Sequence, residues 1–374
     1  MNKTAKTGTA QKIIVTALAL ATVTLLIAGC PSPGGGTPGG GTPEAVVYAA
    51  GPCLTSSGLG VPGYWKDGAW TALTQLDATK GGGAYSLAIS GGDVYVGGHC
   101  INSAGQAVAG YWKNGTWTGL LPLDSIVERV AVSGSDIYVA GGQLGNLVQR
   151  WVAVPGYWKN GVWTGLTPLV PSPPGTTTVS ALVVSGSDVY VGGLTTNSSG
   201  VNGAGYWKNG VWTGLTPIDP AEASRVFSLV VSGSDIYAAG TSNNSSGVMV
   251  PGYWKNGVWT GLTPLDATKD SNVQSLVASG SDIYAAGIST NSSGVMVPGY
   301  WKNGAWTPLT PLDPTKASAA LALLISGSDI YAAGASTNSS GVMVPGYWKN
   351  GVWIGLTPPD PTANSMVSSL VVVQ

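Results

Sequence analysis

One hexapeptide recurs along the chain at nearly even spacing, and it constrains the fold more than any other feature. The string GYWKNG, written GYWKDG in its first copy, occurs seven times in 374 residues. The gaps between its tyrosines are 47, 46, 49, 47, 47 and 47 residues. The tyrosines are Tyr64, Tyr111, Tyr157, Tyr206, Tyr253, Tyr300 and Tyr347. A period in this range is typical of solenoids, arrays and β-propellers, in which each repeat is one supersecondary unit.

The local pattern within one repeat selects among these architectures. Residues 273–309 contain short apolar runs separated by Ser-Gly-Ser-Asp, Asn-Ser-Ser-Gly and Asn-Gly turns. The strands that we predict are 273–278, 283–287, 295–301 and 305–309. Asn303 and Gly304 form the favoured two-residue hairpin turn, which needs positive φ at both positions. Four antiparallel strands without a helical period describe one propeller blade.

The two ends of the repeat region predict a closed ring. Residues 46–51 align with the second strand of the other repeats, whereas residues 367–373 align with the first strand. The C-terminal strand should therefore pair with the N-terminal one inside a single blade, which protects edges that an open array would expose. We expect an all-β, seven-bladed propeller of four-stranded blades over residues 46–374.

The repeats also resemble the kelch family. The shared pattern is a strand with a hydrophobic residue and a tyrosine that ends in a glycine pair, then a tyrosine, a tryptophan six residues later, a leucine and a proline. Four repeats depart from it by having Ala-Gly in place of the glycine pair, as at Ala286 and Gly287. In one repeat these are Val189, Tyr190, Val191, Gly192, Gly193, Tyr206, Trp212, Leu215 and Pro217. The resemblance covers residues 46–374 and implies a binding or scaffolding module.

The N-terminus has the features of an export signal. Three lysines precede an apolar run from Ile13 to Ile27, which at about fifteen residues is shorter than the roughly twenty needed to span a bilayer. The run ends in Leu-Ile-Ala-Gly-Cys at Cys30, which resembles the lipobox of bacterial lipoprotein precursors. The resemblance implies that residues 1–29 are a removed signal peptide and that Cys30 is acylated, which anchors the chain to a membrane.

A tether follows the predicted anchor. Residues 31–44 consist of Pro, Gly, Thr and Ser up to Glu44, so they cannot bury a core, and we assign 30–45 to the lipidated cysteine and a flexible linker. Aspartate is absent after Cys30, where some Gram-negative bacteria read a signal for inner-membrane retention. We therefore favour the outer membrane of a bacterial cell envelope and leave open its periplasmic face or the cell surface.

Tryptophans form a repeated pair in every blade. Fourteen of the fifteen fall opposite each other across the Asn-Gly hairpins, as Trp254 and Trp259 do. Packing between blades is the favoured interpretation, and aromatic platforms for sugars are the alternative.

Composition argues against the usual enzyme chemistries. The chain has one histidine, charged residues make up 9% of it, and the formal net charge is -1. We therefore predict no metal site, no cofactor and no nucleic-acid partner, and we do not expect an enzyme. A hydrolase or lyase that uses a carboxylate pair at the channel mouth remains open.

Variation among the repeats indicates where a ligand binds. The Ser-Gly-Ser-Asp and Asn-Gly turns are nearly invariant and share one end of the ring, here called the turn rim. The opposite end, called the loop rim, carries the loops between second and third strands and between blades, which vary most. One sector of the loop rim breaks the repeat. Its predicted ligand-binding residues are His99, Glu128, Arg129, Arg150 and Trp151. Repeat decay, in which old blades accumulate substitutions, is the alternative explanation.

These observations lead to a ranked set of functions. We expect a monomeric, lipid-anchored binding or scaffold protein that engages a protein or envelope partner through the loop rim. A carbohydrate-binding surface lipoprotein is the alternative. Cys53 and Cys100 occupy matching positions in neighbouring blades, and a disulfide between them remains open because such positions are separated by roughly 9 to 11 Å.

Overall fold

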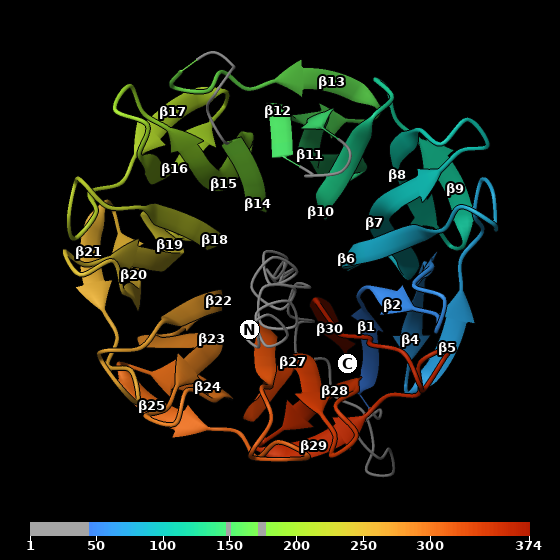
Figure 1. Ribbon diagram of the computed structural model, residues 1–374. Coiled ribbons are helices and arrows are strands. Elements are labelled where there is room, and N and C mark those ends of the chain that lie inside the picture. The colour runs from blue at the N-terminus through green and yellow to red at the C-terminus, as the bar shows by residue number, and fades with distance from the viewer. Residues whose placement is uncertain (1–44, 147–150, 171–176) are drawn as a thin grey trace, which may run out of the picture.

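Strands make up all of the regular secondary structure in the part of the chain that the computed structural model describes, residues 45–146, 151–170 and 177–374. Seven four-stranded antiparallel blades surround a central axis (Figure 1). One further bridge, between Val152 and Thr177, links the third blade to the fourth. The predicted fold class is confirmed. Within the described ranges, no helix is long and apolar enough to cross a membrane.

Each blade starts at the channel with an inner strand and continues outward with a second one (Figure 1). The inner strands, from the first blade to the seventh, are β30 (Ser369–Val373), β6 (Gly82–Ser90), β10 (Ser125–Ser133), β14 (Thr177–Ser185), β18 (Ser224–Ser232), β22 (Ser271–Ser279) and β26 (Ala319–Ser326). The second strands are β1 (Val46–Ala50), β7 (Asp93–Ile101), β11 (Asp136–Asn146), β15 (Asp188–Thr196), β19 (Asp235–Asn243), β23 (Asp282–Thr290) and β27 (Asp329–Thr337).

The third and outer strands of each blade form the Asn-Gly hairpin. The third strands are β4 (Gly63–Lys66), β8 (Ala107–Lys113), β12 (Trp151–Lys159), β16 (Asn202–Lys208), β20 (Met249–Lys255), β24 (Met296–Lys302) and β28 (Met343–Lys349). The outer strands are β5 (Ala69–Ala72), β9 (Thr116–Gly119), β13 (Val162–Gly165), β17 (Val211–Gly214), β21 (Val258–Gly261), β25 (Ala305–Pro308) and β29 (Val352–Gly355). A short hairpin of β2 (Cys53–Leu54) and β3 (Gly60–Val61) is added to the first blade.

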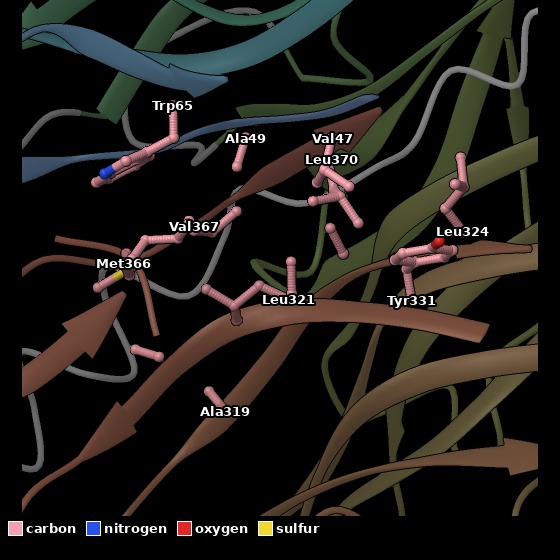
Figure 2. Packing of buried hydrophobic residues seen from close by; sticks show 14 of the residues in the cluster. Val47, Ala49, Trp65, Ala319, Leu321, Leu324, Tyr331, Met366, Val367 and Leu370 are labelled. Atoms are coloured by element: carbon pink, nitrogen blue, oxygen red, sulfur yellow. The ribbon is translucent and has the colours of Figure 1, made fainter. Parts of the chain in front are cut away.

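The ring closes through the first blade, as predicted. β30 pairs with β1 in antiparallel register from Val46 opposite Val373 to Ala50 opposite Ser369. Figure 2 shows the apolar residues that pack between this blade and the seventh, among them Leu321 and Leu370. The two ends of the repeat region are therefore held by backbone hydrogen bonds within one blade and by apolar burial between two blades.

The hairpins have the predicted geometry. Asn256 and Gly257 have φ values of 49° and 84°, and Trp254 lies directly opposite Trp259. The first tryptophan of every pair is fully buried, and its Nε1 donates to a backbone carbonyl in the preceding blade, for example from Trp254 to Thr216 O at 2.7 Å. The second tryptophan stays partly exposed. The structure thus confirms inter-blade packing as the role of the first tryptophan.

The turn rim repeats one polar cluster in six blades. In the fifth blade, Lys255 Nζ lies 2.7 Å from Asp235 Oδ2, and Asn256 Nδ2 donates to Asp235 Oδ1 at 2.8 Å. Asn256 Oδ1 in turn accepts from the backbone N–H of Ile236 at 2.8 Å. The Lys255 ammonium also lies 5.3 Å from the centre of the Tyr237 ring. Each cluster fastens the Asn-Gly hairpin to the Ser-Gly-Ser-Asp turn beside it.

Candidate functional site

The inner strands lose their register at the end nearer the loop rim. In the six strands from β6 to β26, one residue stands unpaired between two paired ones, which is a β-bulge. The residues at this bulge position are Tyr85, Glu128, Ser180, Phe227, Gln274 and Leu321. A bulge redirects a side chain away from the regular alternation. The six bulge positions therefore carry six chemically different side chains at one level of the ring.

The position after the bulge usually holds adjacent inner strands together. Ser228 Oγ accepts from the backbone N–H of Leu276 in the next blade at 3.1 Å. The serines that make the equivalent contact are Ser86, Ser275 and Ser369. We call this contact the serine clasp. It stabilises the ring without any dependence on a ligand.

Arg129 stands where the clasp serine would be in the third blade. Its side chain is 2% exposed, and Nη1 donates to the backbone carbonyl of Glu128 at 2.6 Å. Burial lowers the pKa of Arg129 to about 10, against the attraction of the Glu128 carboxylate, and the positive charge of Arg225 lowers it further. A charged group therefore replaces a small neutral one in the packed interior of the ring.

Arg225, two residues before the bulge of the fifth blade, belongs to the same electrostatic cluster. Burial lowers its pKa to about 10, and the Glu128 carboxylate opposes that shift. Protein atoms surround the guanidinium, although part of the side chain remains reachable by solvent. Its Cζ atom lies 4.8 Å from the centre of the Phe227 ring. The three groups Glu128, Arg129 and Arg225 carry a net positive charge.

A hollow of about 180 Å³ opens on the loop rim beside Arg225. Arg225, Phe227, Asn272 and Gln274 contribute to its wall, so it spans the bulges of the fifth and sixth blades. Gln274 is fully buried, and its Nε2 donates to Asn272 Oδ1 at 2.9 Å. Among the described residues, no hydrogen-bond partner reaches Gln274 Oε1 or Arg225 Nε, and both atoms are buried.

His99 lies in the second blade and contacts the bulge residue of that blade. Its ring stacks on Tyr85 with centroids 5.5 Å apart and planes inclined by 13°. The histidine is buried, at 8% exposure, and its backbone pairs with Gly83. His99 thus supports the bulge of its blade through an aromatic stack.

The five predicted ligand-binding residues have different outcomes. His99, Glu128 and Arg129 lie toward the loop rim in neighbouring blades, the second and third. Arg150 lies outside the described residues. Trp151 begins β12 with its backbone opposite Asn146, and its side chain is likewise outside what the structure describes. Their convergence into one site stays a prediction.

Sequence reasoning missed Arg225, Phe227 and Gln274. A signal for Arg225 was present in the repeat alignment, because the same position holds a different residue in every other blade. Those residues are Gly83, Ile126, Thr178, Asn272, Ala319 and Met366. Phe227 is moreover the single phenylalanine of the chain.

Neither cysteines nor metal ligands add to this site in the described ranges. Cys53 and Cys100 are both buried and free, so the disulfide that the sequence left open is not formed. Burial raises the pKa of Cys53 to about 12 and that of Cys100 to about 11, which keeps both thiols protonated and unreactive. No group of three or more His, Cys, Asp or Glu side chains within those ranges is arranged to hold a metal ion.

The protein resembles known proteins in its three-dimensional structure but not in its sequence. No model of a known protein family matches the chain, and no curated protein matches its sequence. Among solved structures, the crystal structure of AofleA from Arthrobotrys oligospora superposes with a TM-score of 0.42 and 13% identity, over 77% of this chain and 87% of that one. A mutant of the same protein gives a TM-score of 0.40 and 12% identity over the same shares.

Proposed function

We propose that the protein is a non-catalytic, lipid-anchored binding protein of the bacterial cell envelope, which engages its partner through the loop rim. The observation that carries this proposal is the contrast between bulge positions, which differ in chemistry from blade to blade, and the uniform turn rim. Leucine or valine fills the position two residues after each bulge, as Leu229 and Leu276 do. Beyond that position these six inner strands vary only among apolar residues up to their final serine, so variation in polarity is concentrated at the end that a ligand at the loop rim can reach.

The path of the chain supports this orientation. Val46, where the propeller begins, pairs with Val373 at the turn-rim end of the first blade. The tether from Cys30 therefore joins the propeller at the turn rim. Attachment at that end leaves the loop rim facing away from the lipid surface, toward partners in the envelope. The lipobox at Cys30 supports a lipid anchor, and the missing aspartate after it favours an outer-membrane site.

The charge cluster at the loop rim supports binding rather than catalysis. A general acid or base needs a carboxylate that exchanges its proton near the working pH. Glu128 instead lies in the field of Arg129 and Arg225, and its charge opposes the lowering of the pKa of both arginines. We therefore assign Glu128 the part of a counter-ion, in keeping with the kelch-like repeat pattern of interaction domains.

Photo-crosslinking in intact cells tests the proposal. A photo-reactive residue is placed at Leu265 or Leu312 on the loop rim, which are 46% and 48% exposed, and at Val258 or Val352 on the turn rim, which are 70% and 67% exposed. We expect discrete protein or glycan adducts at the loop-rim positions and none at the turn rim. Adducts at the turn rim alone, or at neither rim, would overturn the proposal.

A further inference from the structure

The hollow at the loop rim, lined by residues of the fourth, fifth and sixth blades, indicates a more specific ligand than the loop rim as a whole does. We propose that it binds a small hydroxycarboxylate, whose carboxylate pairs with Arg225 and whose hydroxyl donates to Gln274. The proposal rests on the proposed function, because it gives a ligand chemistry to one part of the loop rim. Arg225 and Gln274 both line the hollow, and each has a buried polar atom without a partner among the described residues, the donor Nε and the acceptor Oε1.

The donor atom calls for an anion. Arg225 Nε is a charged donor that no described residue satisfies, and the guanidinium presents further N–H groups in a planar fork that suits a carboxylate. The three charged groups Glu128, Arg129 and Arg225 sum to one positive charge. A ligand with a single negative charge neutralises the cluster, whereas a second negative charge would meet the Glu128 carboxylate.

The acceptor atom calls for a neutral donor. The hydrogen bond from Gln274 Nε2 to Asn272 Oδ1 fixes the amide so that its oxygen is the atom left without a partner. A buried acceptor without a donor costs free energy, which a ligand recovers when it supplies one. An ammonium group would lie in the field of Arg129 and Arg225, so a hydroxyl suits the position better. This requirement distinguishes a hydroxycarboxylate from an amino acid.

The size and the apolar wall of the hollow restrict the ligand further. Its volume of about 180 Å³ is below the roughly 300 Å³ at the low end of small-molecule sites. Leu194, Phe227 and Met249 contribute apolar wall, which suits the C–H surface of a compact molecule. The same chemistry is offered by a free sugar acid and by a terminal uronic acid unit of an envelope glycan that enters from the rim.

Comparison with the seventh blade shows that the fold of a blade does not require the polar residues of the hollow. The seventh blade has Ala319 at the position of Arg225 and Leu321 at the position of both Phe227 and Gln274, and its inner strand keeps the same bulge. An alanine and a leucine therefore satisfy the backbone there. The bulge therefore does not require Arg225 or Gln274, and we assign both residues to ligand recognition.

Calorimetric titration of the full-length lipidated protein in detergent micelles tests the proposal. The probes are galacturonate, its methyl glycoside, galactose and acetate. We expect galacturonate to bind at least tenfold more tightly than galactose, which lacks the carboxylate, and than acetate, which lacks the hydroxyls. Binding of the methyl glycoside supports a terminal glycan unit, and its failure beside galacturonate supports a free sugar acid. Equal affinities for galacturonate and galactose, or no binding of any acid, would overturn the proposal.

Three variants assign the contacts. Arg225→Gln should weaken galacturonate binding at least tenfold, whereas Lys255→Gln removes the same charge from the turn rim of the same blade and should leave affinity within twofold. Gln274→Leu introduces the residue of the seventh blade. It should raise the melting temperature of the free protein, because it removes a buried acceptor without a donor. It should weaken galacturonate binding, because the ligand hydroxyl loses that acceptor in the complex. Unchanged affinity in Arg225→Gln or Gln274→Leu contradicts the assignment.

The crosslinking experiment keeps the two proposals separate. Adducts at Leu265 and Leu312 without any acid binding would remove the hollow as a ligand site and leave the loop rim as the binding surface. Acid binding that Arg225→Gln abolishes, without crosslinked adducts, would keep the hollow and exclude a macromolecular partner. Failure of both would remove the whole functional assignment.

Discussion

The two rims of the propeller differ in how they use polar residues. On the turn rim, six blades repeat the same lysine, aspartate and asparagine, and the six lysine–aspartate distances fall between 2.7 and 3.0 Å. On the loop rim, the polar groups differ from blade to blade and several of them are buried. The comparison shows that one fold can separate repeated contacts that hold it together from individual residues that give it specificity.

Burial explains why the two kinds of residue affect stability in opposite directions. The turn-rim side chains keep contact with water and pair with each other, so each cluster adds a little and none carries a large desolvation penalty. Arg129 and Gln274 lie inside the protein, where a charge or an unpaired acceptor reduces stability. Substitutions in the repeated scaffold should therefore lower the free energy of unfolding. Replacing buried charged or unpaired polar residues of the loop rim by apolar ones should raise it.

The largest expected effect comes from the scaffold. Trp254→Ala should lower the free energy of unfolding by about 3 to 5 kcal/mol, because it empties a fully buried site and leaves the Thr216 carbonyl without its donor. Trp259→Ala, in the same pair, should lower it by about 1 kcal/mol, since the side chain is partly exposed. Urea denaturation measures both. Equal losses would contradict the assignment of inter-blade packing to the first tryptophan.

The next effect should have the opposite sign. Burial lowers the pKa of Arg129 from 12.5 to about 10. While Arg129 is protonated in both the folded and the unfolded protein, this shift reduces the free energy of unfolding by about 3 kcal/mol. The cost is relieved as the pH rises through 10, because the folded protein then releases the proton. The double variant Glu128→Leu/Arg129→Ala installs the pair of the seventh blade, Leu321 and Ala322. It should raise the free energy of unfolding by about 1 to 2 kcal/mol at neutral pH, less than the cost relieved at Arg129, because Arg225 loses the carboxylate that opposes its own burial.

A single substitution provides the control for that pair. Arg129→Ala alone should raise the free energy of unfolding less than the double variant does, because it relieves the buried charge but leaves the Glu128 carboxylate without one of its positive neighbours and opens a space in the ring. The same urea titration compares the three proteins. A double variant that is no more stable than the single one would show that Glu128 and Arg129 belong to the scaffold.

A smaller effect should come from the serine clasps. Ser228→Ala removes the acceptor of the Leu276 N–H and should lower the free energy of unfolding by about 1 kcal/mol. The fourth blade has Ala181 at this position, so Ala181→Ser should add a clasp to Leu229 and raise stability by roughly 0.5 to 1 kcal/mol. Thermal or urea unfolding of both variants tests this. A lower free energy of unfolding in both variants would mean that side-chain packing, and not the hydrogen bond, determines which residue is favoured at this position.

Sequence patterns predicted the fold because its determinants are local and repeated. The Asn-Gly turns, the opposed tryptophans and the alignment of residues 46–51 and 367–373 each follow from spacing along the chain, and each is confirmed. The hollow could not be predicted in the same way. It depends on bulges that move side chains out of alternation and on contacts between blades about one repeat apart, neither of which a strand pattern encodes.

The smallest expected effect concerns the turn rim and depends on pH. Hydrogen bonds from Lys255 and then Asn256 lower the pKa of Asp235 below its ordinary value of 3.8. A carboxyl with a lowered pKa in the folded state adds stability above the unfolded pKa, and that contribution is lost as the pH falls through the folded value. Asp235→Asn should therefore lower the urea midpoint slightly at about pH 7, and by progressively less as the pH falls through the folded pKa of Asp235.

The first blade offers a matched control for this prediction. Its Lys66 follows the same GYW sequence, yet Val46 stands at the position of the aspartate, and Asp67 accepts from the backbone N–H of Val47 at 2.8 Å. Lys66→Gln should therefore change the urea midpoint less than Lys255→Gln at about pH 7. A pH-independent effect of Asp235→Asn, or equal effects of the two lysine variants, would mean that the turn rim is held by hairpin geometry alone. The uniform ion pairs would then contribute nothing to the difference between the rims.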